Sequence, residues 1–359
     1  MKNKKLYKLE AIRGFAAIYV LLGHVFVSKL NFYGIDFSLF LRFGQEGVIL
    51  FFIMSGFVIQ YSFDKSKDKS FKNYFLKRFY RIYIPLIIVF IANYIVLIIE
   101  KHVFQPINIQ ELLGNLFMLQ DLFGLKQNVI CSPFLGNLPL WSLSYEWWFY
   151  MIFFFLRTKF KDNASNIVMI LAVISTISYI FYPFFLNRLL MYLIIWWIGA
   201  DLASLYLNRN NIDFKPIKLQ ISILLLCLGI LILNIAINRT NIKHILGSSS
   251  IGMSPFLEFR HFLFTIVALF IAIIWNKYKW LGFSKTFGLF EPFAGISFGL
   301  YISHYFLIAR AQYLNNYIEN SIIRYIFYFM ICFCFSYIIE RIIYRKIHNV
   351  VFLKNKIIN

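Results

Sequence analysis

The sequence predicts an all-α polytopic membrane protein, a bundle of about ten transmembrane helices with both termini cytoplasmic. Of its 359 residues, 60% are hydrophobic and 14% are charged, and the mean hydropathy of +0.69 lies outside the range of soluble domains. Runs of about twenty apolar residues alternate with short polar or basic stretches, which is typical of helices that cross a membrane. We expect one integral-membrane domain over residues 1–359.

The apolar runs define ten expected spans. They lie at 11–28, 45–63, 82–99, 138–156, 166–185, 189–207, 219–237, 261–275, 293–309 and 321–339. With the N-terminus inside, 26 of the 36 Lys and Arg residues fall on the inner side. The net charge of +20 is thus spread over short inner loops, which argues against a nucleic-acid partner. The outer segment Leu112–Gly124 is apolar enough to be interfacial or re-entrant.

The first span carries two polar side chains on one helical face. Arg13 and His24 are eleven residues apart, close to three full turns of an α-helix. The rise between them is about 16 Å, roughly half a hydrocarbon core. We therefore expect Arg13 near the inner surface and His24 near the outer end of this span.

Other polar groups fall at the same two depths. Glu46, Glu146 and His304 are expected in the outer half of spans two, four and nine, where imidazole and carboxylate groups exchange protons near neutral pH. Polar residues inside a bilayer are costly and mark functional positions. Arg78 and Arg81, three residues apart at the inner surface, form a fork suited to phosphate, although membrane anchoring is the alternative.

The segment PLWSLSYEWWFY, Pro139–Tyr150, begins the fourth span with a polar face. Ser142 and Glu146 share that face at i,i+4 spacing, and Tyr145 lies beside them. A carboxylate at this depth would hold His24 in one tautomer and support its imidazolium form. The alternative is an interfacial aromatic belt with Glu146 exposed at the membrane surface.

The ninth span carries Ser297, Tyr301 and His304 on one face. Tyr301 and His304 are expected to contact substrate, and the alternative for His304 is a hydrogen bond between packed helices. The remaining histidines are expected to be solvated: they are His102, His244, His261 and His348. The four cysteines suggest neither a disulfide framework nor a zinc site, and no metal is expected.

With these residues identified, the chain resembles the membrane-bound acyltransferase family 3 over nearly its whole length. The likeness rests on five motifs in order. They are Arg13-x10-His24, the Ser-Gly-Phe at the end of GVILFFIMSGF, Arg78-Phe-Tyr-Arg81, LWSLSYEWWFY and ISFGLYISH. One departure is that Glu340-Arg341 is followed by Ile342, where the family often has Pro. We also expect no fused soluble esterase domain of the kind that some members carry.

The resemblance implies an O-acetyltransferase of the bacterial inner membrane. The donor would be cytoplasmic acyl-CoA, acetyl or succinyl, bound at Arg13, Arg78 and Arg81. The acceptor would be a hydroxyl of an extracytoplasmic surface polysaccharide or lipid-linked glycan. His24 would act as general base or be acylated itself, with Glu146 orienting it, while Glu46 and the polar faces of spans four and nine meet the substrate.

Three other functions remain open on the sequence alone. A flippase or exporter of a polysaccharide precursor would use His24, Glu146 and His304 as a proton relay, and it would move substrate without consuming acyl-CoA. A polysaccharide polymerase would need carboxylates in its large outer loops, where this chain has few. A non-catalytic membrane scaffold would not require polar groups matched at two depths.

Overall fold

A computed structural model describes residues 6–26, 31–32, 35–36, 41–209, 217–237 and 252–353. Within them, nine helical runs are long and apolar enough to cross a membrane, and one of these, at Leu138–Phe181, is 44 residues long and joins two helices. All ten expected spans therefore correspond to helical segments, and the predicted all-α class is confirmed. The expected loops 209–218 and 238–260 lie partly outside the described residues.

Eight of the spans begin and end within about six residues of the predicted positions, whereas the third begins eleven residues earlier than predicted and the tenth continues fourteen residues further. The first eight spans are α1 (Tyr7–Phe26), α2 (Gly44–Lys65), α3 (Phe71–Lys101), α5 (Trp141–Phe160), α6 (Ala164–Phe181), α7 (Phe185–Arg209), α8 (Lys218–Ile237) and α10 (Phe256–Lys277). The ninth is composite, with the 3₁₀ helix η9 (Phe287–Ile296), the short α11 (Ser297–His304) and the π-helix η10 (Tyr305–Ala309). The tenth joins α12 (Ser321–Tyr337), η11 (Ile338–Ile343), α13 (Tyr344–His348) and η12 (Asn349–Leu353).

Two short strands and one short helix lie between the spans. The two-residue strands β1 (Asn31–Phe32) and β2 (Ile35–Asp36) form an antiparallel pair. Helix α4 (Ile109–Leu116) lies in the long segment before α5, and the side chain of its N-cap residue, Asn108, accepts a hydrogen bond from Glu111 N. Beyond α4, Met118 and Leu122 are buried, so this segment folds back against the bundle.

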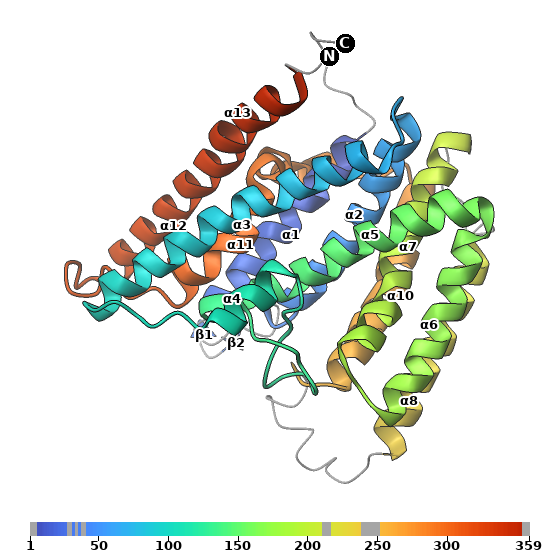
Figure 1. The fold of residues 1–359 in the computed structure, drawn as a ribbon, viewed down its shortest axis with the longest axis horizontal. Helices are drawn as coiled ribbons and strands as arrows, with labels where there is room; N and C mark the ends of the chain where they lie inside the picture. Colours follow the sequence, from blue (N-terminus) through green and yellow to red (C-terminus); the bar gives the residue numbers. More distant parts are fainter. Residues whose placement is uncertain are drawn as a thin grey trace.

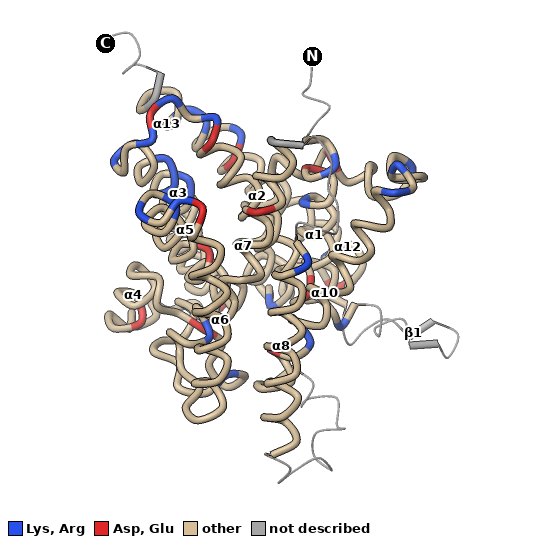
Figure 2. The backbone as a smooth tube through the Cα atoms, turned by 90° about the vertical axis from the view of Figure 1, so that its right-hand side faces the viewer, with Lys and Arg blue, Asp and Glu red and all other residues tan. Residues whose placement is uncertain are grey.

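Helices α1 and α2 lie at the centre of the bundle (Figure 1). The ninth span packs against α1, α7 packs against α2, and α6 and α8 lie farther out on the α7 side. Lys and Arg gather at the end of the molecule that holds α13 and the start of α3 (Figure 2). This distribution agrees with the charge bias expected for the inner side.

Glycines let the central helices approach their neighbours backbone to backbone. A Cβ added at Gly14 on α1 would lie 1.9 Å from the carbonyl oxygen of Phe290 in η9. On the other side, a Cβ at Gly56 would lie 1.9 Å from Trp196 O, and one at Gly199 would lie 1.9 Å from Ile53 O. Such reciprocal contacts between small residues are the usual basis of close helix packing in membranes.

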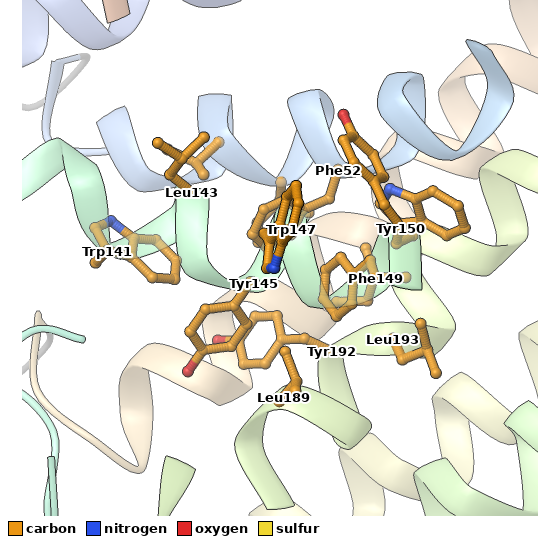
Figure 3. Packing of buried hydrophobic residues seen from close by; sticks show 14 of the residues in the cluster. Phe52, Trp141, Leu143, Tyr145, Trp147, Phe149, Tyr150, Leu189, Tyr192 and Leu193 are labelled. Atoms are coloured by element: carbon orange, nitrogen blue, oxygen red, sulfur yellow. The ribbon is translucent and has the colours of Figure 1, made fainter. Parts of the chain in front are cut away.

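Aromatic side chains fill the space between α2, α5 and α7. Phe52, Phe149 and Tyr192 are fully buried there, and their rings pack in edge-to-face contacts (Figure 3). Tyr145 and Tyr150 project from opposite sides of α5 in the same view. Because these two residues are five positions apart, the helix separates their hydroxyls into two different environments.

The glycine contact between α2 and α7 yields a test of the packing. Replacing Gly56 with Ala should destabilise the fold by about 3 kcal/mol, because the new methyl group collides with the backbone of α7. Gly229→Ala on α8 is the matched control, since nothing lies within 4 Å of its Cβ position. Thermal unfolding in detergent measures both variants, and equal midpoints would contradict the proposed contact.

Candidate functional site

A cavity of about 360 Å³ opens between α1, α2, α3, α5, the ninth span and α13. Its lining runs from Lys77, Arg78 and Arg81 near the basic end to Ser142 and Tyr301 deeper in the bundle. A volume of this size falls in the range of small-ligand pockets. Six of the ten residues predicted for the site line this cavity, which makes it the candidate site.

The basic end of the cavity holds Lys77, Arg78 and Arg81, and the two arginines have different partners. Arg78 Nη2 donates to Ser62 Oγ at 2.8 Å, and its guanidinium lies over the ring of Tyr74. Nε of Arg78 is buried without a hydrogen-bond partner among the described residues. Arg81 is ion-paired with Glu340. Arg78 is therefore the better placed of the expected pair to meet an external anion.

Arg81 is held in place by the last span. Its guanidinium forms the ion pair with Glu340 and stacks on the rings of Phe298 and Tyr344. Glu340 lies in the π-helix η11, which continues directly into α13 because Ile342 stands where a proline would end the helix. Glu340 thus fixes the basic end of the cavity, a role that was not predicted from the sequence.

Arg13 faces the middle of the cavity and not its mouth. In the described part of the chain its guanidinium donates no hydrogen bond, although it lies close enough to Glu146, Tyr150 and Arg81 for electrostatic interaction. Its charge therefore remains available to a ligand within the cavity. Together with Arg78 and Lys77, it gives the cavity more cations than carboxylates, which suits a polyanion.

Glu146 is bound by hydroxyl groups in the same middle region. Ser55 Oγ donates to its Oε1 at 2.7 Å, and the Tyr150 hydroxyl donates to the same oxygen. Ser55 precedes Gly56, so one short motif supplies both the helix contact with α7 and a ligand of the carboxylate. Ser55 and Tyr150 were not predicted as site residues, although both belong to motifs that carry the family resemblance.

The deep end of the cavity contains a pair of hydroxyls. Ser142 Oγ lies 2.7 Å from the Tyr301 hydroxyl, which donates to the carbonyl oxygen of Pro139 at 2.9 Å. Ser142 and Glu146 both line the cavity, as their i,i+4 spacing predicts. Ser297 and Tyr301 do so from α11, one turn apart.

His24 lies beside His304 just beyond this deep end. The two imidazole rings have centroids 5.2 Å apart, and the centroids of the His304 and Tyr301 rings are 6.2 Å apart. Neither histidine lines the cavity, whereas Tyr301 does. Tyr301 therefore separates the cavity from the histidine pair.

The expected pairing of Glu146 with His24 is wrong in this structure. The carboxylate hydrogen bonds to Ser55 and Tyr150, and the neighbours of the His24 ring are His304 and Tyr305. The reason is the orientation of α5 about its axis, which directs Glu146 toward α2 and the cavity. Identical depth in the membrane did not bring the two groups together.

Tyr145 is fully buried on the other side of α5 and does not line the cavity. Its hydroxyl donates to Asp121 Oδ2 at 2.8 Å. Asp121 also pairs with Lys126 Nζ at 2.8 Å and Arg188 Nε at 3.2 Å, and all three charged side chains are inaccessible to solvent. We name Asp121, Lys126 and Arg188 the outer charge cluster; it ties the segment before α5 to α7, so Tyr145 acts there as a structural hydrogen-bond donor.

Two further expectations need correction. Glu46 is expected to meet substrate, but it is buried in an ion pair with Arg260 at 2.6 Å and lies outside the cavity lining. His261 is expected to be solvated, but it is fully buried with Nδ1 2.6 Å from the Tyr192 hydroxyl. His348 lines the cavity mouth. Nothing in the sequence near the end of a span tells whether a histidine there will be buried, as His261 is, or will line a cavity, as His348 does.

The outer charge cluster should make the folded protein less stable as the pH falls into the acid range. Burial by itself would raise the pKa of Asp121, but Lys126, Arg188 and the hydrogen bonds from Lys126 and Tyr145 outweigh it and hold the pKa below its ordinary value. A lowered carboxyl pKa adds stability that is fully present above about pH 4 and is lost as the pH falls through the folded-state value.

We predict that Asp121→Asn lowers stability by about 3 kcal/mol at neutral pH, because it leaves buried Lys126 and Arg188 without their carboxylate. The difference from the wild type should shrink as the pH falls below about 4. Thermal unfolding in detergent between pH 7 and 3 measures it, with exposed Asp162→Asn as control. A difference that grows toward acid pH would contradict this interpretation of the cluster.

One comparison with known proteins found a match that covers nearly the whole chain. A family model described as an acyltransferase domain matches residues 6–341, from the start of α1 to η11. No curated protein and no solved structure matched the chain. The matched range contains the cavity lining except for Tyr344 and His348, and it contains the whole histidine pair. The chain therefore belongs to the membrane-bound acyltransferase family 3 and is a multi-pass membrane acyltransferase.

Proposed function

We propose that this acyltransferase moves an acetyl or succinyl group from cytoplasmic acyl-CoA to a hydroxyl of an extracytoplasmic surface carbohydrate. The observation that carries the proposal is the cavity, which leads from a cationic end to a wall, Tyr301, that contacts His304 of the histidine pair. Such a passage suits a donor with phosphates at one end and a reactive group at the other. The bacterial inner membrane is the proposed location, since its two sides would separate the donor from the acceptor.

The donor would enter from the basic end. Its phosphates would meet Arg78 and Lys77 at the mouth, and Arg13 would attract the negative groups that reach farther in. Arg81 would act mainly by shaping the mouth, because Glu340 already neutralises its charge. The pantetheine arm would then follow the cavity past Ser55 and Glu146 toward Ser142 and Tyr301.

His24 is the proposed general base. It would take the proton of the acceptor hydroxyl while that oxygen attacks the thioester carbonyl carbon. The new C–O ester bond forms, the C–S bond breaks, and the proton passes from His24 to the CoA sulfur. In the alternative route, His24 itself is acylated and then passes the acyl group to the hydroxyl, and the overall reaction is the same. In either route, Tyr301 would have to move aside for the thioester to reach the imidazole.

The half-buried position of His24 favours an acceptor that arrives from the outer side. Its helix α1 ends two residues later, at Phe26, so the imidazole lies within one turn of the outer end of the span. A sugar hydroxyl on a polysaccharide or lipid-linked glycan can reach this depth without crossing the bilayer. A proton-coupled exporter, by contrast, would move substrate without consuming acyl-CoA.

The first prediction for this function concerns His24. His24→Ala should lower acylation of surface glycan at least a hundredfold, because general base catalysis typically contributes that much. The measurement is NMR of O-acyl groups on glycan isolated from cells that express each variant at equal membrane levels. His102→Asn is the control, since this exposed histidine has a positive φ that asparagine tolerates. Unchanged acylation in His24→Ala would refute the proposed role.

The second prediction concerns donor binding. Arg78→Ala should weaken binding of coenzyme A about tenfold or more, because it removes charge-assisted hydrogen bonds to phosphate. The stabilisation of detergent-solubilised protein by added coenzyme A measures this, with exposed Lys285→Ala as control for loss of one positive charge. If both variants respond to coenzyme A like the wild type, the phosphates bind elsewhere.

A further inference from the structure

His304 is fully buried and presents a nitrogen without a partner. Its Nδ1 lies 3.1 Å from the carbonyl oxygen of Leu300, one turn earlier in α11. A carbonyl oxygen only accepts hydrogen bonds, so Nδ1 carries the proton and Nε2 of the neutral ring carries the lone pair. This Nε2 has no hydrogen-bond partner among the described residues. A buried acceptor left in this state is costly unless something donates to it.

The imidazole of His24 is the neighbour that can donate. The two ring centroids lie 5.2 Å apart with the planes tilted by 41°. No direct hydrogen bond joins the two rings, so one water between them would connect Nε2 of His304 to the N–H of His24. Tyr305 packs edge-on against the His24 ring at 5.5 Å. Among the described residues, no other hydrogen-bond partner competes for the N–H of the His24 ring.

The backbone around His304 holds this arrangement in place. The α-helical part of the ninth span ends at His304, and the π-helix η10 begins at the next residue. Short π-helical turns of this kind are frequent at functional sites, where they redirect side chains. The same span is held tightly against α1 at Gly14, so the two histidines belong to elements that cannot slide freely past each other.

We propose that His304 is the positioning residue for His24. One water donates to its Nε2 and accepts the N–H of His24, which holds the other His24 nitrogen unprotonated and directed at the acceptor hydroxyl. His304 takes no proton during the reaction and touches no reacting atom. This inference rests on the proposed function, and it replaces the carboxylate expected at Glu146 with a neutral imidazole.

Two substitutions of similar polarity test the role of Nε2. The glutamine amide of His304→Gln reaches the place of Nε2, whereas the asparagine amide of His304→Asn reaches only the place of Nδ1. We expect His304→Gln to keep the turnover rate within about tenfold of the wild type and His304→Asn to lose at least a hundredfold. The KM for acetyl-CoA should stay unchanged in both.

The rates are measured in inverted membrane vesicles supplied with radiolabelled acetyl-CoA, with transfer to endogenous glycan as readout. Equal rates in the glutamine and asparagine variants, or a loss expressed in KM, would overturn the positioning role. Because His304 lies outside the cavity, stabilisation by coenzyme A should persist in both variants and verifies that they are folded.

A second measurement does not depend on variants of His304. In protein with ¹⁵N-labelled histidine, the Nε2 signal of His304 should shift when His24 is replaced by Ala, because the water between the rings loses its second partner. No shift would overturn the proposal even if a His304 variant fails to fold. The proposed function and the positioning role can fail separately. If His24→Ala stays active, the proposed function is refuted. If His24→Ala is inactive but the two His304 variants have equal rates, only the positioning role is refuted.

Discussion

Close backbone contact between the central helices and their neighbours is the constraint on which the rest of the structure depends. Gly14 brings α1 against the ninth span, and Gly56 and Gly199 bring α2 against α7. In a bilayer the lipid tails are as apolar as the helices, so dispersion contacts of this kind hold the bundle together. They also set the positions of the polar groups, because Gly14 lies on the same helix as Arg13 and His24, and Gly56 lies on the same helix as Ser55. The cavity and the histidine pair follow from these two contacts.

Within this frame, α5 divides the polar chemistry of the protein into two regions. On one side Glu146 and Tyr150 face the cavity with Ser55, and on the other side Tyr145 joins the outer charge cluster. The first region keeps charge open to a ligand, since Arg13 donates no hydrogen bond within the described chain. The second region pairs its charges internally and holds the outer segment in place. The two regions are separated because their residues lie on different faces of α5, not because they lie at different depths in the membrane.

The separation of Arg13 and His24 along α1 places them on the two sides of Tyr301. Arg13 contributes to the middle of the cavity, and His24 lies past its deep end behind Tyr301. The proposed donor and acceptor sides thus meet at one aromatic side chain. Such a barrier suits an enzyme that must keep water and acceptor away from a thioester until both are aligned.

The sequence by itself determined the ten helical spans, the basic inner end and the residues that carry the acyltransferase motifs, because hydropathy and spacing along one helix are local properties. It also placed Ser142 with Glu146 and Ser297 with Tyr301, since each pair shares a helix face. Only the tertiary structure decided which faces meet. It assigned Arg81 to Glu340, Glu146 to Ser55 and His24 to His304, since contacts between helices depend on their relative rotation and on glycine-mediated approach, which no single helix encodes.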